Sequence, residues 1–219
     1  MPETLEILRR RLERERQARK QAEQISEDKS RELFLKNQEL SRLAEAEKNA
    51  RLEVERLSLT DPLTSLSNRR HFDQVAGLEF SRAERYRLSL AAIMMDLDHF
   101  KRINDGYGHA AGDRVLVEAA AASQKILRVV DLGARIGGEE FCFLLPETGL
   151  EGGRRLAERL RAAVAGLRFQ LDGEPLIVTA SFGLAERKHE SDSLADLLAR
   201  ADQTLYRAKN EGRNRVCSF

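Results

Sequence analysis

Hydrophobic and polar positions follow one pattern up to residue 57 and a different one beyond it. The first part is rich in Glu, Arg, Lys, Gln, Ala and Leu, has no proline between Pro2 and Pro62, and has no glycine before Gly77. These residue types favour a helix. Its second half carries apolar residues at heptad spacing: Leu33, Leu40 and Val54 at one core position, and Leu43, Ala50 and Leu57 at the other. The pattern predicts a long helix that pairs as a coiled coil.

The heptad is not regular along the whole helix. Within the second half it is broken at Lys36 and Glu47. Continued toward the N-terminus, the same register reaches Leu12, Leu8 and Leu5, but it passes through the polar residues Arg19, Ser26 and Lys29. The apolar residues between them, Ala18, Ala22 and Ile25, fit a shifted register. We therefore expect a discontinuity near residues 15–32. A solvated single helix or a partly disordered linker is the alternative.

Beyond residue 57, short apolar runs alternate with amphipathic stretches. Pro62 cannot continue a helix, so the long helix should end by the segment Asp61-Pro62-Leu63-Thr64. We expect helices at 69–87, 114–129, 153–165 and 193–210, strands at 89–95, 176–184 and 215–219, a β-hairpin at 133–146, and a glycine-containing loop at 104–112. This mixture predicts an α/β or α+β domain with a mixed sheet at 58–219, preceded by a helical domain at 1–57.

Length and charge narrow the classes of function. The chain has 219 residues, enough for one domain of about 150 residues and an extension. Its 37 Lys and Arg residues nearly balance 36 Asp and Glu residues, so no basic field points to nucleic acid or to membranes. Cys142 and Cys217 are expected to be reduced thiols. With no apolar run of about 18 residues and no signal peptide, we expect a cytoplasmic protein with no membrane segment; a preceding sensor domain stays open.

The segment Gly137-Gly138-Glu139-Glu140-Phe141 is the first candidate for chemistry. Two glycines, which tolerate positive φ and close approach of a ligand, come before two adjacent carboxylates at the predicted hairpin bend. Asp96 follows a buried strand, and it converges with Glu139 if the two strands are neighbours. Convergent carboxylates repel unless a cation separates them, and Mg²⁺ is the usual one with phosphate substrates. Alone, solvated acids at a hairpin tip and a turn-capping aspartate are the alternatives.

Further polar residues fit a nucleotide. Lys101 follows the same strand and adds positive charge where phosphates could bind. Asn104 and Asp113 flank the glycine-containing segment, and such a pair is able to read guanine, although spacing alone does not show it. Lys209 and Arg213 lie four residues apart at the end of the last predicted helix. They suit either terminal phosphates or the negative end of the helix dipole.

Several motifs in order resemble the GGDEF family of diguanylate cyclases, over about residues 58–219. They are Asp61-Pro62-Leu63-Thr64, Asn68-Arg69-Arg70, Asp96-Leu97-Asp98-His99-Phe100-Lys101, Asn104-Asp105, Gly108-His109, Gly112-Asp113, Gly137-Gly138-Glu139-Glu140-Phe141, and the segment Leu205 to Asn214. Glu in place of Asp at 139 is a common active variant of that family. The resemblance implies a palm-like fold similar to nucleotidyl cyclases, with a central mixed, mostly antiparallel sheet flanked by helices. It also implies condensation of two GTP into cyclic di-GMP with release of two pyrophosphates.

The resemblance also implies roles for individual residues. Asp96, the Leu97 carbonyl and Glu139 would hold two Mg²⁺ ions per active site, with Mn²⁺ as a substitute, and Glu140 would be a metal-site or proton-accepting carboxylate. Guanine would be read by Asn104 and Asp113, and the phosphates would be held by Phe100, Lys101, Lys209 and Arg213. A product-inhibitory site for cyclic di-GMP would consist of Arg128, Asp131 and Arg159.

In that family the two reacting groups sit on different domains, so the resemblance implies a homodimer, which the predicted parallel coiled coil would hold together. A change of register at the discontinuity would let an upstream sensor domain or partner switch the enzyme. Other readings of the sequence are a catalytically silent receptor for GTP or cyclic di-GMP, a coiled-coil scaffold, and a cyclase with relaxed base choice. The first usually lacks the acids or phosphate-binding cations that are present here, and Asp113 argues against the last.

Overall fold

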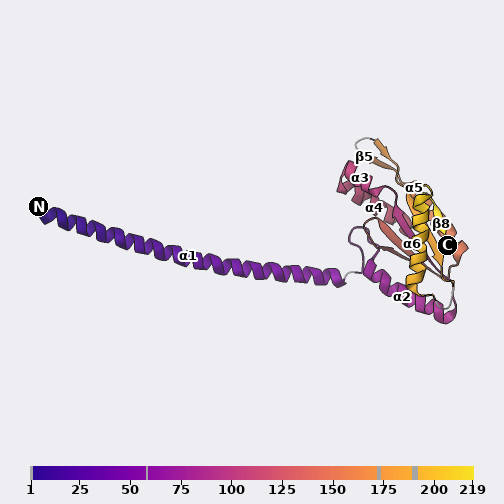
Figure 1. Cartoon of the computed structure of the whole chain (residues 1–219), viewed down its shortest axis with the longest axis horizontal. Helices are drawn as coiled ribbons and strands as arrows, with labels where there is room; N and C mark the ends of the chain where they lie inside the picture. The colour runs from indigo at the N-terminus through magenta and orange to yellow at the C-terminus, as the bar shows by residue number, and fades with distance from the viewer. Residues whose placement is uncertain (1, 58, 172–173, 189–191) are drawn as a thin grey trace. The chain divides into compact units, whose positions relative to one another are not determined.

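The computed structural model describes residues 2–57, 59–171, 174–188 and 192–219, and it divides into two compact units, residues 1–58 and 59–219. In the first unit, α1 (Pro2–Leu57) is one continuous helix (Figure 1). The heptad residues Leu33, Leu40, Leu43 and Val54 are 61% to 69% exposed on it. The predicted long helix is therefore confirmed, and its pairing as a coiled coil stays a prediction.

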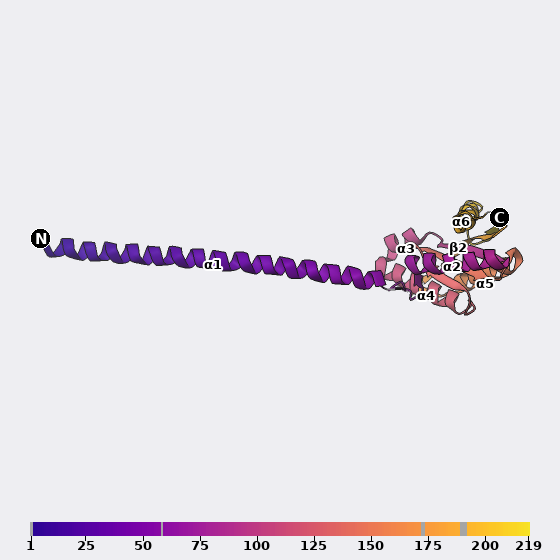
Figure 2. The same cartoon turned by 90° about the horizontal axis from the view of Figure 1, so that it is seen from below.

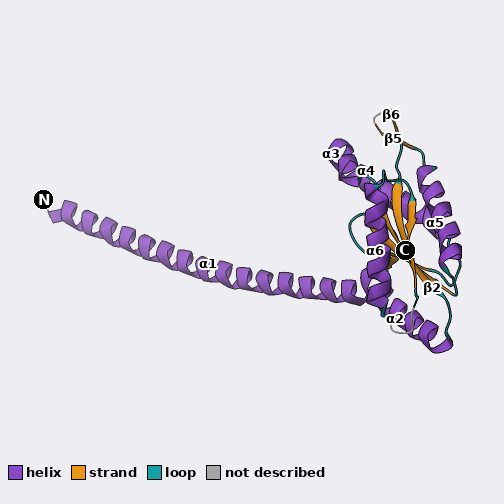
Figure 3. Ribbon diagram, turned by 45° about the vertical axis from the view of Figure 1, so that its right-hand side comes forward, coloured by secondary structure: helices purple, strands orange, loops and turns teal. Residues whose placement is uncertain are grey.

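The second unit is built on a six-stranded sheet in the order β1-β3-β4-β2-β7-β8. Its strands are β1 (Ser67–Asn68), β2 (Leu90–Leu97), β3 (Leu132–Arg135), β4 (Glu140–Pro146), β7 (Ala180–Glu186) and β8 (Val216–Ser218). The central strand β2 is antiparallel to β4 and β7, β3 is antiparallel to β4, and the pairs β1–β3 and β7–β8 are parallel. The predicted mixed, mostly antiparallel sheet is confirmed. A small hairpin of β5 (Phe169–Leu171) and β6 (Glu174–Leu176) forms a separate sheet (Figure 3).

Helices cover both faces of this sheet because β2 is apolar on both sides. Ala91, Ile93 and Met95 pack in the core formed with α4 (His109–Gln124) and α5 (Leu150–Ala165). Leu90 and Ala92 point the other way, to the core formed with α2 (Arg69–Tyr86) and α6 (Leu194–Asn210). Figure 2 shows α4 and α6 on opposite sides of the sheet.

Local signals at several helix ends agree with the sequence. The Asn68 side chain caps α2 by accepting a hydrogen bond from the His71 amide at 2.9 Å. Ser193 and Asp196 form a reciprocal capping box at the start of α6. Cys142 and Cys217 are buried free thiols, as predicted. No helix of the described residues is both long and apolar enough to cross a membrane.

The predicted loop at 104–112 is wrong. The chain forms α3 (Phe100–Tyr107) and α4 with a sharp junction at Gly108, where φ is +80°. Gly112 lies inside α4, at a position where a Cβ would overlap the Asn104 side chain. The glycine is therefore needed for close helix packing and not for a turn. The helix predicted at 114–129 therefore begins earlier than predicted, at His109, and it also ends earlier, at Gln124. The strand predicted at 176–184 is also divided, between β6 and β7.

Candidate active site

The acid hairpin and strand β2 bring the predicted carboxylates together. The antiparallel register of β2 and β4 places Asp96 opposite Glu140, and the Leu97 amide donates a hydrogen bond to the Glu139 carbonyl at 3.3 Å. The two strands are thus neighbours, as predicted. Neither hairpin glycine has a positive φ, contrary to expectation. A Cβ at Gly137 would instead overlap the Glu140 carboxylate, so that position needs a glycine for space.

Burial and like charge raise the proton affinity of this acid pair. Asp96 is 5% exposed, and burial raises its pKa. The positive charge of Lys209 lowers this pKa, and the negative charges of Glu140 and Asp98 raise it. The pKa of Glu139 is raised by burial and then by the charge of Asp96. Two carboxylates with raised pKa values are a site with uncompensated negative charge, which favours binding of a cation.

Lys209 supplies the positive charge that the pair has in this structure. Its Nζ lies 2.7 Å from Asp96 Oδ2, and it comes from the last turn of α6, on the sheet face that Asp96 shares. Among the described residues no group of three or more His, Cys, Asp and Glu side chains converges as a metal site. A divalent cation here would therefore use Asp96 and Glu139 together with backbone oxygen, and the Leu97 carbonyl is the neighbouring candidate. The oxygen donors suit Mg²⁺ or Mn²⁺.

Helices α3 and α4 bring the predicted nucleotide residues together. The Phe100 side chain is 5% exposed and belongs to the core, so only the backbone of this residue is available to a ligand. Its amide lies in the first turn of α3, where N–H groups have no partner within the helix. Lys101 is exposed beside it. Asn104 packs against Gly112, which places it next to the exposed Asp113.

Arg213 lies in the connection between α6 and β8. It is exposed, and its backbone has a positive φ of 59°. Its amide donates a hydrogen bond to the Ala208 carbonyl at 3.0 Å, which folds the connection back onto the end of α6. This places the positive charge of Arg213 just beyond Lys209, on one continuous segment.

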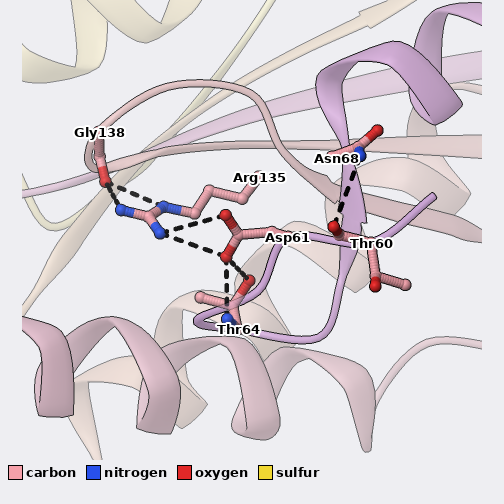
Figure 4. Close-up of polar contacts among 6 residues, drawn as sticks. All are labelled: Thr60, Asp61, Thr64, Asn68, Arg135 and Gly138. Atoms are coloured by element: carbon pink, nitrogen blue, oxygen red, sulfur yellow. Dashed lines mark hydrogen bonds and ion pairs between the residues drawn. The ribbon is translucent and has the colours of Figure 1, made fainter. Parts of the chain in front are cut away.

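An arginine outside the predicted set holds the acid hairpin (Figure 4). Arg135 donates to the Gly138 carbonyl from Nη2 at 2.7 Å and from Nε at 3.1 Å, and its Nη1 lies 3.2 Å from Asp61 Oδ1. Asp61 also accepts from the Thr64 amide and hydroxyl at 2.8 and 2.7 Å. Burial raises the pKa of Asp61, but the hydrogen bonds from Thr64 and the charge of Arg135 outweigh this effect, so the pKa is lowered.

Sequence reasoning used Asp61 as a helix terminator and as part of a family motif, and it missed this contact because the two partners are 74 positions apart. The available signal was the Asp-x-x-Thr spacing, in which a carboxylate accepts local hydrogen bonds and so forms a compact turn.

Two of the three predicted inhibitory residues line a second pocket, of about 240 Å³, and the third, Asp131, is bonded to one of them. Arg128 donates to Asp131 from Nη2 at 2.9 Å and from Nε at 3.2 Å, and its Nη2 also donates to the Thr148 hydroxyl at 2.7 Å. The hydrogen bond with Asp131 raises the pKa of Arg128. Arg128 and Arg159 both line the pocket, together with Arg155. The structure therefore brings the three predicted residues together and adds a further arginine.

The chain matches the family model described as "Diguanylate cyclase, GGDEF domain" over residues 58–215. It is 49% identical over 159 residues to the diguanylate cyclase DgcP of Pseudomonas aeruginosa, which covers 73% of this chain and 24% of DgcP. It spans about half or less of the length of the curated relatives compared with it, up to 54% for the diguanylate cyclase VdcA of Vibrio cholerae.

Two solved structures extend the likeness into the N-terminal helix. The coiled coil and GGDEF domain of DgcB from Caulobacter crescentus, in complex with c-di-GMP, has a TM-score of 0.71 at 30% identity and covers 85% of this chain and 97% of that one. The diguanylate cyclase SiaD in complex with its activator SiaC, from Pseudomonas aeruginosa, has a TM-score of 0.71 at 36% identity, with coverage of 97% and 86%. With a family model that matches most of its length, the chain belongs to the GGDEF-domain family of diguanylate cyclases.

Proposed function

We propose that this chain condenses two GTP molecules into cyclic di-GMP and two pyrophosphates. The observation that carries the proposal is the acid pair of Asp96 and Glu139, with raised pKa values, next to Lys209. This arrangement suits a divalent cation that is bound to the phosphates of a substrate. The reaction is inferred from the family to which the chain belongs.

In this proposal each group of residues has one task. Asp96, Glu139 and the Leu97 carbonyl hold two Mg²⁺ or Mn²⁺ ions, which supply Lewis-acid stabilisation of charge on the reacting phosphate. Asn104 and Asp113 read guanine. The backbone at Phe100 and the side chains of Lys101, Lys209 and Arg213 hold the β- and γ-phosphates. Glu140, which is exposed at the hairpin, would accept the proton of the attacking 3′-hydroxyl or complete the metal site.

A dimer is part of the proposal because each domain offers one set of GTP-binding residues. The 3′-hydroxyl of one GTP then attacks the α-phosphate bound to the partner domain. A parallel coiled coil of α1 would hold two domains at an effective concentration of about millimolar. Its exposed heptad leucines support this pairing. An upstream sensor domain or a partner protein would act by changing the register; SiaD, to which the chain is similar, has been solved in complex with its activator SiaC.

Replacing Arg19, Ser26 and Lys29 with leucine tests the register hypothesis. The substitutions should lock one register of α1 and so fix the activity at one level. Unchanged activity, together with an unchanged response to an activating signal, would contradict the hypothesis.

Product inhibition completes the proposal. Arg128, Asp131 and Arg159 would bind cyclic di-GMP at the second pocket, where the guanidinium groups suit phosphate and guanine. The DgcB structure in complex with c-di-GMP supports a role for the product in this family.

The direct test is incubation of the purified full chain with GTP and Mg²⁺, followed by chromatography of the nucleotides. The control is the double variant Glu139→Ala/Glu140→Ala. Cyclic di-GMP in the parent reaction alone is the expected result. GTP binding without product would favour the silent receptor, and product from the double variant would remove Glu139 and Glu140 from the mechanism.

A further inference from the structure

We infer that Asp98 is a positioning residue that holds the phosphate-binding loop between α6 and β8 in place. Asp98 is 6% exposed and follows Asp96 by two positions. Its Oδ1 accepts a hydrogen bond from the Ser181 hydroxyl at 2.7 Å. Its Oδ2 accepts from the Thr179 hydroxyl at 2.7 Å and from the Asn214 backbone amide at 3.0 Å. The inference rests on the proposed function, because it assigns the loop to the GTP phosphates.

The hydrogen bond to Asn214 matters because this loop has an unfavourable backbone. Gly212, Arg213 and Asn214 have φ values of +114°, +59° and +45° in succession. Two of these residues carry a Cβ, and such conformations persist only where surrounding contacts impose them. The contacts at hand are the charge-assisted bond to Asp98, the bond from the Arg213 amide to the Ala208 carbonyl at 3.0 Å, a bond from Arg161 Nη1 to Asn214 Oδ1 at 3.0 Å on the surface, and pairing of the Arg215 carbonyl with β7. Only the first of these joins the loop to a buried charge.

The same strand end therefore carries two functions. Asp96 belongs to the acid pair, and Asp98 anchors the loop that follows Lys209 and includes Arg213. Because both acids belong to one short segment, the hydrogen bond from the Asn214 amide to Asp98 joins the loop that includes Arg213 to the strand end that carries Asp96.

The test compares Asp98→Ala, Arg213→Ala and the double variant in the full chain. Isothermal titration with a GTP analogue whose α–β bridge is a methylene measures binding without turnover, and the matching GMP titration measures binding without the β- and γ-phosphates. Asp98→Ala should weaken binding of the triphosphate analogue about tenfold, the effect of losing one hydrogen bond to a charged group, and leave GMP binding unchanged. The double variant should bind no more weakly than Arg213→Ala, because both changes remove the same contact.

Two further variants separate positioning from stability. Ser181→Ala removes a hydrogen bond to Asp98 without touching Asn214, so it should lower the melting temperature and keep triphosphate binding. Asp98→Asn should also keep binding, since its amide oxygen still accepts from Asn214 while its NH₂ donates to the Ser181 hydroxyl. Asp98→Ser, too short to reach Asn214, replaces Asp98→Ala if that variant does not fold.

Equal weakening of both nucleotides, additive effects in the double variant, or loss of binding in Asp98→Asn would overturn the inference. A parent protein that binds neither nucleotide would overturn the proposed function instead.

Discussion

Replacing Arg135 with alanine tests how strongly the acid hairpin depends on its support. The substitution removes the ion pair with Asp61 and both hydrogen bonds to the Gly138 carbonyl. The paired side chains are 16% and 18% exposed. Exposed ion pairs contribute about 0–1 kcal/mol to stability, and breaking a buried pair costs about 3–5 kcal/mol. Because the burial of this pair is intermediate, we expect the free energy of unfolding to fall by about 2 kcal/mol. A domain of this size then melts about 4–8 °C lower.

Activity should fall further than stability alone explains. The Gly138 carbonyl directly precedes Glu139, so releasing it lets the proposed catalytic carboxylate of Glu139 move relative to Asp96. Misplacement of a catalytic group by about 1 Å costs up to about a hundredfold in rate. We expect a fall of about tenfold or more in kcat for cyclic di-GMP formation at saturating GTP, measured at a temperature well below melting.

Asp61→Asn is the matched control. It weakens the ion pair and leaves Arg135 bonded to the hairpin, so it should lower the melting temperature with a smaller effect on kcat. Because the folded pKa of Asp61 is lowered, the pair stabilises the protein above the ordinary value of 3.8 and is lost as pH falls below it. The difference in stability between Asp61→Asn and the parent should therefore close in acid. Full activity in Arg135→Ala, or equal kcat losses in the two variants, would refute the reasoning.

Three other predictions use the same site and its neighbours. Since the pKa values of Asp96 and Glu139 are raised, Mn²⁺ binding measured by titration calorimetry should weaken as pH falls, starting above the ordinary carboxyl values; affinity that stays constant until pH reaches those ordinary values would contradict this. Arg128→Ala should keep the initial rate and abolish the early stall of product formation in progress curves. Gly112→Ala should raise the KM for GTP at least about tenfold by displacing the side chain packed against it, whereas Gly106→Ala, which faces open space, should leave KM within about twofold.

Local sequence signals predicted most helices and strands, but they could not predict contacts between residues far apart in the sequence. Helix α6 and its cap, the acid hairpin, and the neighbouring strands of Asp96 and Glu139 follow from apolar periodicity and capping residues. The helices over 104–112 were missed because glycine usually indicates a turn, while Gly112 is required here by the packing of two helices. The bonds of Asp98 to Thr179 and Ser181 join residues more than 80 positions apart, and no local pattern encodes such a pairing.

Strand β2 explains why the site tolerates so much charge at the edge of an apolar core. Its residues alternate between two packed faces up to Leu97, so a slip of one position in register would turn Asp96 toward the opposite, apolar core. That penalty fixes the strand, and the strand fixes Asp96 against β4. The repulsion among Asp96, Glu139 and Glu140 is then opposed by Lys209 from α6, and the apolar residues of that helix hold it to the sheet face that Asp96 shares. The packed cores thus hold the carboxylates close together despite their mutual repulsion. A bound cation removes that repulsion, and this favours its binding.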